Sequence, residues 1–338
     1  MAYTTIDDPS AYFQIALYNG NAGTQSITND GASNLQPDMV WIKCRSGTHA
    51  TENHNLFDSV RGVNKFAITN GTTAANSTDT NSLTAFNSDG FSLGTRTDVN
   101  GSGAYVGWQW KESATAGFDI VSFTGNSSDG ATTQDISHSL SAVPHWIIVK
   151  NGADSTNWAV YHKANTSSPE TEVIYLNLTN ATADDNAFFG DTAPTSSQFR
   201  VGGDNSVNGN SDSMIAYLWS EKQGFSKFGS FTGNGNADGP FVYTGFKPAW
   251  VMAKRTGTSG QNWEIHDNKR PEYNSSSKRL WANLSNAEAT EDPYLDLVSN
   301  GFKIKTSDTN YNASDSYIYM AFAESPFVNS NGIPNNAR

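Results

Sequence analysis

Three short motifs recur in the same order along the chain, and this recurrence constrains the fold more than any other feature of the sequence. The first motif is an aromatic residue followed by x-Gly-Asn, and its copies end at Asn21, Asn126 and Asn234. The second is a proline followed six residues later by a lysine, in the copies Pro37 to Lys43, Pro144 to Lys150 and Pro248 to Lys254. The third is an apolar stretch that ends in Glu112, Glu221 or Glu324. The Pro-to-Glu separations are 75, 77 and 76 residues, so the sequence predicts three copies of one unit.

Each predicted unit spans about 105 residues, which is near the usual size of an independent domain. We place the units at residues 1–113, 114–223 and 224–338. Only a few residues separate one unit from the next, so no long flexible linker is expected. The sequence leaves two arrangements open, in which the units either pack against one another or form a stiff rod.

The composition indicates an all-β fold. The 338 residues include 36 Asn and 29 Gly, while aromatic residues remain at 12% and charged residues fall to 16%. Asn and Gly favour tight turns, and short runs of alternating apolar residues lie between the turn signals. We therefore predict three tandem antiparallel β-sandwiches of jelly-roll or lectin-like type.

Two strands of each unit show their faces in the sequence. The strand between the motif proline and lysine is apolar on both faces, which predicts a central strand that is covered on both sides. In the strand before the closing glutamate, every second residue is large and apolar, as in Val106, Trp108 and Trp110. The intervening residues are mixed, so this strand is expected to have one core face and one half-exposed face.

Charge and segment lengths exclude several classes of function. The net charge of −12 leaves no basic face for nucleic acid. No apolar run approaches the ~20 residues of a membrane span, so membrane insertion is not expected. The first ten residues contain Asp7 and Asp8 and lack an apolar core, which gives no indication of a signal peptide. The single cysteine, Cys44, fits synthesis in a reducing cytoplasm.

Asp58 with Arg61, and Asp267 with Arg270, form the most conspicuous pairs of charged residues. They occupy corresponding positions in the first and third units, where the second unit has His162 instead of the aspartate. An aspartate and an arginine three residues apart could form a binding site. The alternative that we favour is an ion pair that locks a turn at the end of a strand.

Trp41, Trp146 and Trp250 recur at similar positions of the central strands. Aromatic faces beside Asn and Asp side chains are typical of carbohydrate recognition, so these tryptophans are candidate sugar-stacking residues. The alternative is that they fill the three sandwich cores, and the number of tryptophans (nine) favours it.

No cofactor or metal site is predicted. The stretch 233–239, rich in Asn and Gly with Asp238, offers oxygen atoms for a calcium ion, but it lacks the spacing of an EF-hand and a plain turn is favoured. His49 and His54 lie close in sequence without further ligands. No serine-hydrolase elbow, phosphate-binding loop or zinc-protease motif occurs, so we expect a protein that is not an enzyme.

Longer motifs carry a resemblance to a known family. They include the opening residues 2–14, and in the third unit the stretches 227–239, 245–251, 267–270, 299–303 and 319–327. With residues 35–43 and 58–62, the sequence resembles a family of repeat-bearing virion proteins of marine phages. The resemblance implies a tail-fibre-like structural protein, and it supplies no catalytic residues. The second unit departs from the pattern at His162 and Asn165.

Three functions compete at this stage. The leading hypothesis is a virion surface protein, tail-fibre-like or adhesin-like, that contacts host surface glycans and other virion proteins and forms a homo-oligomer, a trimer by analogy. The second is a purely structural head-decoration, tail collar or adaptor protein. The third is a glycan-degrading enzyme, whose carboxylates would be Asp267 with Glu264, or Glu288 with Glu291.

Overall fold

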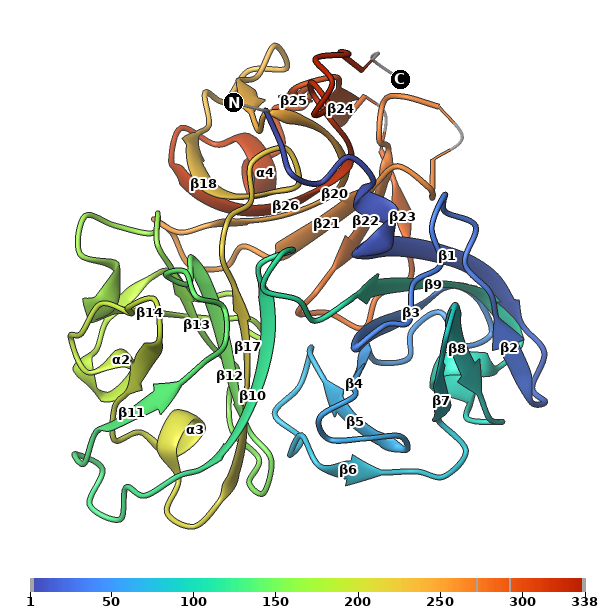
Figure 1. Ribbon diagram of the computed structural model, residues 1–338. Coiled ribbons are helices and arrows are strands. Elements are labelled where there is room, and N and C mark those ends of the chain that lie inside the picture. Colours follow the sequence, from blue (N-terminus) through green and yellow to red (C-terminus); the bar gives the residue numbers. More distant parts are fainter. Residues whose placement is uncertain (1–2, 272, 292, 336–338) are drawn as a thin grey trace.

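The structure is a computed structural model that describes residues 3–271, 273–291 and 293–335. Three six-stranded antiparallel sheets dominate it, and they surround a common centre (Figure 1). We call the stretches of chain that form these sheets the first, second and third segments, which comprise residues 13–110, 118–219 and 226–326. Within the described residues, no helix is long and apolar enough to cross a bilayer.

The first segment forms a large sheet in the order β1-β9-β3-β4-β5-β6 and a small sheet in the order β2-β8-β7. The elements, with the short helix that precedes them, are η1 (Pro9–Ala11), β1 (Phe13–Gly20), β2 (Gln25–Ile27), β3 (Met39–Gly47), β4 (Asn55–Asp58), β5 (Lys65–Ile68), β6 (Ser77–Thr78), β7 (Leu83–Asn87), β8 (Gly90–Leu93), α1 (Thr97–Asn100) and β9 (Gly103–Trp110).

The second segment repeats this order of strands as β10-β17-β12-β13-β14-β15, with a two-stranded sheet β11-β16. The elements are β10 (Phe118–Thr124), β11 (Gln134–Ser137), β12 (Trp146–Asn151), β13 (Ala159–His162), η2 (Pro169–Thr171), β14 (Glu172–Tyr175), β15 (Ala183–Asp184), α2 (Asn186–Phe189), β16 (Gln198–Val201), α3 (Asn205–Asn208) and β17 (Ser213–Trp219).

The third segment has the order β18-β26-β20-β21-β22-β23 and a small sheet β19-β25-β24. The elements are β18 (Ser226–Thr232), β19 (Phe241–Tyr243), β20 (Phe246–Arg255), β21 (Trp263–Asp267), β22 (Lys278–Trp281), β23 (Ala289–Thr290), β24 (Leu295–Val298), β25 (Gly301–Ile304), α4 (Thr309–Asn312) and β26 (Ser316–Pro326).

The strand between the motif proline and lysine is central in each large sheet, as the sequence predicts. β3 lies between β9 and β4, β12 between β17 and β13, and β20 between β26 and β21. All residues of β12, from Trp146 to Asn151, are buried. One face of this strand packs under the small sheet of its own segment, and the other face points toward the centre of the molecule.

The prediction of a half-exposed face on the last strand is wrong. Gln109 in β9 and Leu218 in β17 are buried together with their large neighbours. The cause is the small sheet of each segment. Leu218, for example, belongs to the same cluster as Phe199 of β16, so that face is covered as well.

The expectation that the tryptophans fill a separate sandwich core in each unit is also wrong. One cluster at the centre contains residues of all three segments, among them Trp108, Tyr217 and Met320. The first and second segments have further clusters beneath their small sheets. The three large sheets thus bury their inner faces against one another, and the segments pack together instead of forming a rod (Figure 1).

A buried asparagine explains the aromatic-x-Gly-Asn motif. Asn100, at the end of α1, accepts a hydrogen bond from the Asn21 backbone N–H (3.2 Å) and donates through Nδ2 to the Gly94 carbonyl (2.8 Å). The same bonds join Asn208 to Asn126 and Gly202, and Asn312 to Asn234 and Thr306. A Cβ at Gly20 would lie 1.9 Å from the Gly101 carbonyl oxygen, so this motif position requires glycine.

Candidate functional site

The three candidate sugar-stacking tryptophans lie inside the molecule. Trp41, Trp146 and Trp250 are 3%, 0% and 0% exposed. The Trp250 ring packs edge-on against Trp108 and Trp110, with centroids 6.3 and 5.7 Å apart. A glycan cannot reach rings in these positions, so their placement favours packing over sugar stacking.

Asp58 and Arg61 lie at the seam between the first and second segments. Both side chains are at least 95% buried, and the two residues form an ion pair. The Tyr217 hydroxyl, from β17 of the second segment, donates to Asp58 Oδ2 (2.7 Å) and accepts from Arg61 Nη2 (3.1 Å). The pair therefore joins two segments, which fits the ion-pair alternative.

Asp267 and Arg270 form the corresponding pair at the seam between the third and first segments. Arg270 Nε donates to Asp267 Oδ2 (2.6 Å), and both side chains are 0% exposed. Trp108 Nε1, from β9 of the first segment, donates to the same carboxylate oxygen (3.0 Å). Trp108 thus occupies the place that Tyr217 takes at the first seam.

The seam between the second and third segments explains why the second unit lacks the ion pair. In strand register, the residue that corresponds to Trp108 and Tyr217 is Met320, which has no hydrogen to donate to a carboxylate. His162 replaces the aspartate, and its Nε2 bonds the Tyr319 carbonyl (3.1 Å). Burial lowers the pKa of His162 to about 3, so the imidazole is neutral at physiological pH.

Sequence reasoning missed the role of the three motif lysines. Lys43, Lys150 and Lys254 are 0% exposed, and the bonds described for their ammonium groups run to backbone carbonyls and one threonine hydroxyl. Lys150 donates to the Thr72 carbonyl of the first segment (3.1 Å). Burial lowers the pKa of each lysine to about 8. The signal was the invariant lysine at the end of an otherwise apolar strand.

The carboxylates considered for glycoside hydrolysis are all paired with arginines. Asp267 bonds Arg270, and Glu288 lies between Arg270 and Arg45 at 3.2 and 3.3 Å. Glu264 and Glu291 both contact Arg279, at 3.4 and 2.8 Å. Each of these four carboxylates is thus held in an ion pair with an arginine of the protein itself.

The oxygen-rich stretch 233–239 forms a network of turns. Asn234 Oδ1 accepts from the Asn236 N–H (3.0 Å), Asn236 Oδ1 accepts from the Asp238 N–H (3.0 Å), and Asp238 pairs with Lys303 (2.6 Å). These bonds are those of Asx turns. Over residues 3–271, 273–291 and 293–335, no group of three His, Cys, Asp or Glu side chains has an arrangement that could hold a metal ion.

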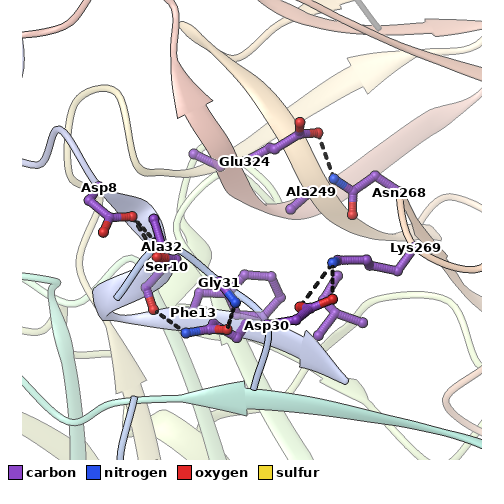
Figure 2. A pocket seen from close by; sticks show the side chains of 13 residues that line it. Asp8, Ser10, Phe13, Asp30, Gly31, Ala32, Ala249, Asn268, Lys269 and Glu324 are labelled. Atoms are coloured by element: carbon purple, nitrogen blue, oxygen red, sulfur yellow. Dashed lines mark hydrogen bonds and ion pairs between the residues drawn. The ribbon is translucent and has the colours of Figure 1, made fainter. Parts of the chain in front are cut away.

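A surface groove opens at the seam between the third and first segments, and Figure 2 shows it from close by. Its volume is about 270 Å³. Asp8 and Ala32 lie on one side, Lys269 lies on the other, and Glu324 and Asn268 lie along the third-segment edge. Lys269 Nζ contacts both oxygens of Asp30 (3.0 and 2.8 Å), and Asn268 Nδ2 donates to Glu324 (2.6 Å).

A small residue contributes to the opening of this groove. At the position after the motif proline, Asp38 accepts from the Glu112 N–H and His145 accepts from the Glu221 N–H, each at 2.8 Å. The third segment has Ala249 at this position, and Ala249 lines the groove. Sequence reasoning missed the groove, although comparison of the residues after the three motif prolines would have pointed to it.

The closing glutamate of the first unit predicts an effect of pH on stability. Burial, together with a hydrogen bond to Asp119, raises the pKa of Glu112 from 4.5 to about 7. The folded state therefore holds a proton that the unfolded state releases, so the free energy of unfolding falls as pH rises from about 4.5 to 7. Because Glu112 is partly exposed, we expect a loss of roughly 1–2 kcal/mol. Urea unfolding across this pH range measures it.

The control for this effect is Glu112→Gln, which keeps the shape and can donate to Asp119. This variant should be more stable than the wild type at pH 8 and should show a flatter dependence on pH. An unchanged slope between pH 4.5 and 7 would refute the assignment to Glu112.

Comparison with known proteins places the chain in a family without assigning it an activity. A family model described as "Domain of unknown function (DUF7483)" matches residues 8–326. No curated protein matches the sequence. The matched range begins in the η1 region and ends with β26, so it includes all three segments.

Proposed function

The chain belongs to the DUF7483 family, and from the resemblance of its motifs to those of repeat-bearing marine phage virion proteins we propose that it is a structural protein of a phage virion surface, tail-fibre-like or adhesin-like, that contacts host surface glycans. The structural role is supported by the positions of the charged and histidine side chains. Asp58 with Arg61, Asp267 with Arg270, and His162 all join neighbouring segments. Residues that an enzyme would expose to substrate here hold the protein together.

We also propose that the three segments are tandem copies of one β-sandwich of jelly-roll type, with boundaries at residues 1–113, 114–223 and 224–338. The common strand order of the three large sheets supports this interpretation. The buried asparagines Asn100, Asn208 and Asn312 support it independently, because each accepts a hydrogen bond from the same position of the aromatic-x-Gly-Asn motif.

The glycan part of the proposal predicts adsorption. Purified, fluorescently labelled protein should bind host cells and should compete with phage particles for them, and digestion of the cell-surface polysaccharide should abolish the binding. A glycan array made from host envelope material checks the same point. If neither cells nor glycans are bound, the adhesin role is excluded and the structural role remains.

The structural part has its own test. Antibody labelling or mass spectrometry of purified particles should find the protein in the virion, and light scattering measures whether it is a homotrimer, as the analogy with other phage appendages predicts. A head-decoration, collar or adaptor position is the alternative, and the location of the label on the particle distinguishes it from a fibre. The protein is proposed to act without a cofactor.

A further inference from the structure

We propose that the groove between the third and first segments binds one neutral pyranose ring of a glycan. This inference rests on the glycan contact proposed above and names the site for it. The groove lies where the loop after β21 and the strand end at Glu324 approach β1 and the loop at Asp30 (Figure 2).

The size and floor of the groove suit a single sugar ring. A volume of about 270 Å³ lies just below the roughly 300–1,000 Å³ that pockets for drug-sized ligands occupy, as a site for a single small ring would. Its apolar lining comes from Phe13, Ile15, Ala32, Ala249 and Ala323. Alkyl and aromatic groups of this kind can pack against the C–H face of a pyranose while its hydroxyls point to the rim.

The rim offers hydrogen-bond acceptors with remaining capacity. Asp30 is 70% exposed in its side chain and bonds only Lys269 among the described interactions, while Glu324 accepts one bond at each oxygen. Each carboxylate oxygen has two lone pairs, so further O–H donors can be accepted. Lys269, whose side chain is 40% exposed, adds a donor beside them. A ligand rich in hydroxyl groups matches this set.

The charge of the lining selects among sugars. Asp8, Asp30 and Glu324 contribute three negative charges, against two positive charges from Lys269 and from Lys247, which pairs with Glu324 at 2.9 Å. Phosphate or a uronic acid would be repelled by the excess of carboxylates, whereas an uncharged hexose would not. The geometry therefore favours neutral sugars over anionic ones.

The corresponding points of the other two seams are occupied by the protein itself. Glu112 hydrogen-bonds Asp119, and Glu221 pairs with Lys227 at 2.7 Å. The residue of the first segment that corresponds to Asp119 and Lys227 is Gln14, whose side chain bonds the backbone of Ser10, Gly31 and Ser33 instead of Glu324. Together with Ala249 in place of His145, this leaves the third seam open.

The test uses the full chain and the methyl glycosides of glucose, galactose, mannose and N-acetylglucosamine, with glucuronic acid and inorganic phosphate as anionic probes. Binding is measured by saturation-transfer NMR and calorimetry. Ala249→His places at the groove floor the residue that the second segment has there, His145. Because the larger side chain fills the groove, we expect the dissociation constant of the bound glycoside to rise at least about tenfold. Ala153→His makes the same change at an exposed loop and should have no effect.

Asp30→Ala is the second variant, and it is expected to fold because Asp30 is exposed. It should weaken binding severalfold. Neutral-glycoside binding that survives both variants, binding of the anionic probes alone, or no binding of any methyl glycoside by the wild type would each overturn the inference. If the variants still adsorb to host cells as the wild type does, the groove is excluded while the proposed adhesin function stands.

Discussion

Replacing Asp58 by alanine is expected to destabilise the protein by about 3–5 kcal/mol, the usual cost of removing one partner of a buried ion pair. Arg61 would keep its charge with a side chain that is 5% exposed, and the Tyr217 hydroxyl would lose its acceptor. Chemical denaturation, followed by tryptophan fluorescence, measures the loss. Because the pair joins two segments, the whole transition should shift.

Asp135→Ala is the matched control. Asp135 also forms a two-bond pair with an arginine, Arg200, but both side chains are about one-third exposed or more. An exposed pair contributes at most about 1 kcal/mol. If Asp58→Ala costs no more than Asp135→Ala, the seam role of Asp58 is refuted.

The second segment suggests how the loss could be repaired. At the seam between the second and third segments, the corresponding residues are His162, Asn165 and Met320, in place of Asp58, Arg61 and Tyr217 of the first seam. A triple variant that copies these three residues into the first seam should be more stable than Asp58→Ala, with a favourable interaction energy of at least about 1 kcal/mol among the substitutions. If the stability changes of the three substitutions simply add, the residues of one seam cannot replace those of the other.

The sequence predicted which residues share a strand face, but it did not predict which part of the chain covers that face. Period-two alternation placed Trp108 with Trp110 on one face of β9, and the structure confirms that both are buried. Alternation cannot say whether the covering layer belongs to the same unit or to another. The inner faces are covered by neighbouring segments, so the tryptophans that we expected in separate sandwich cores lie in one shared cluster, beside the smaller clusters of the first and second segments.

The prediction of the candidate sites was limited in the same way, because the sequence does not show which residues of different segments meet. The sequence shows Asp58 and Arg61 as a pair. Tyr217 lies 156 residues beyond Arg61, and only the folded structure brings its hydroxyl to this ion pair. The sequence alone shows that the second segment lacks the Asp–Arg pair. That Met320 takes the position of Tyr217 and Trp108 follows only from the pairing of the strands in the structure. The groove depends in part on the small side chain of Ala249 where the other segments have Asp38 and His145, a difference that comparison of the three segments reveals.

Truncation of a central tryptophan should destabilise all three segments together. Trp250→Ala removes a side chain that is 0% exposed and packs against Trp108 and Trp110 of the first segment. Loss of a large buried aromatic costs about 3–5 kcal/mol, because it removes apolar contacts and leaves a cavity. Because the shared cluster couples the segments, calorimetry should show one transition at a lower temperature.

Tyr273→Ala is the control, since Tyr273 belongs to the same segment and is 72% exposed, and its transition should match that of the wild type. Independent segments would give a different result, in which Trp250→Ala splits the transition and lowers only one part of it. Hydrogen exchange adds residue-level evidence, because amides of β3 and β12, far from residue 250 in sequence, should lose protection in parallel with those of β20. Retained protection in β3 and β12 would mean that the central cluster contributes little to holding the three sheets together.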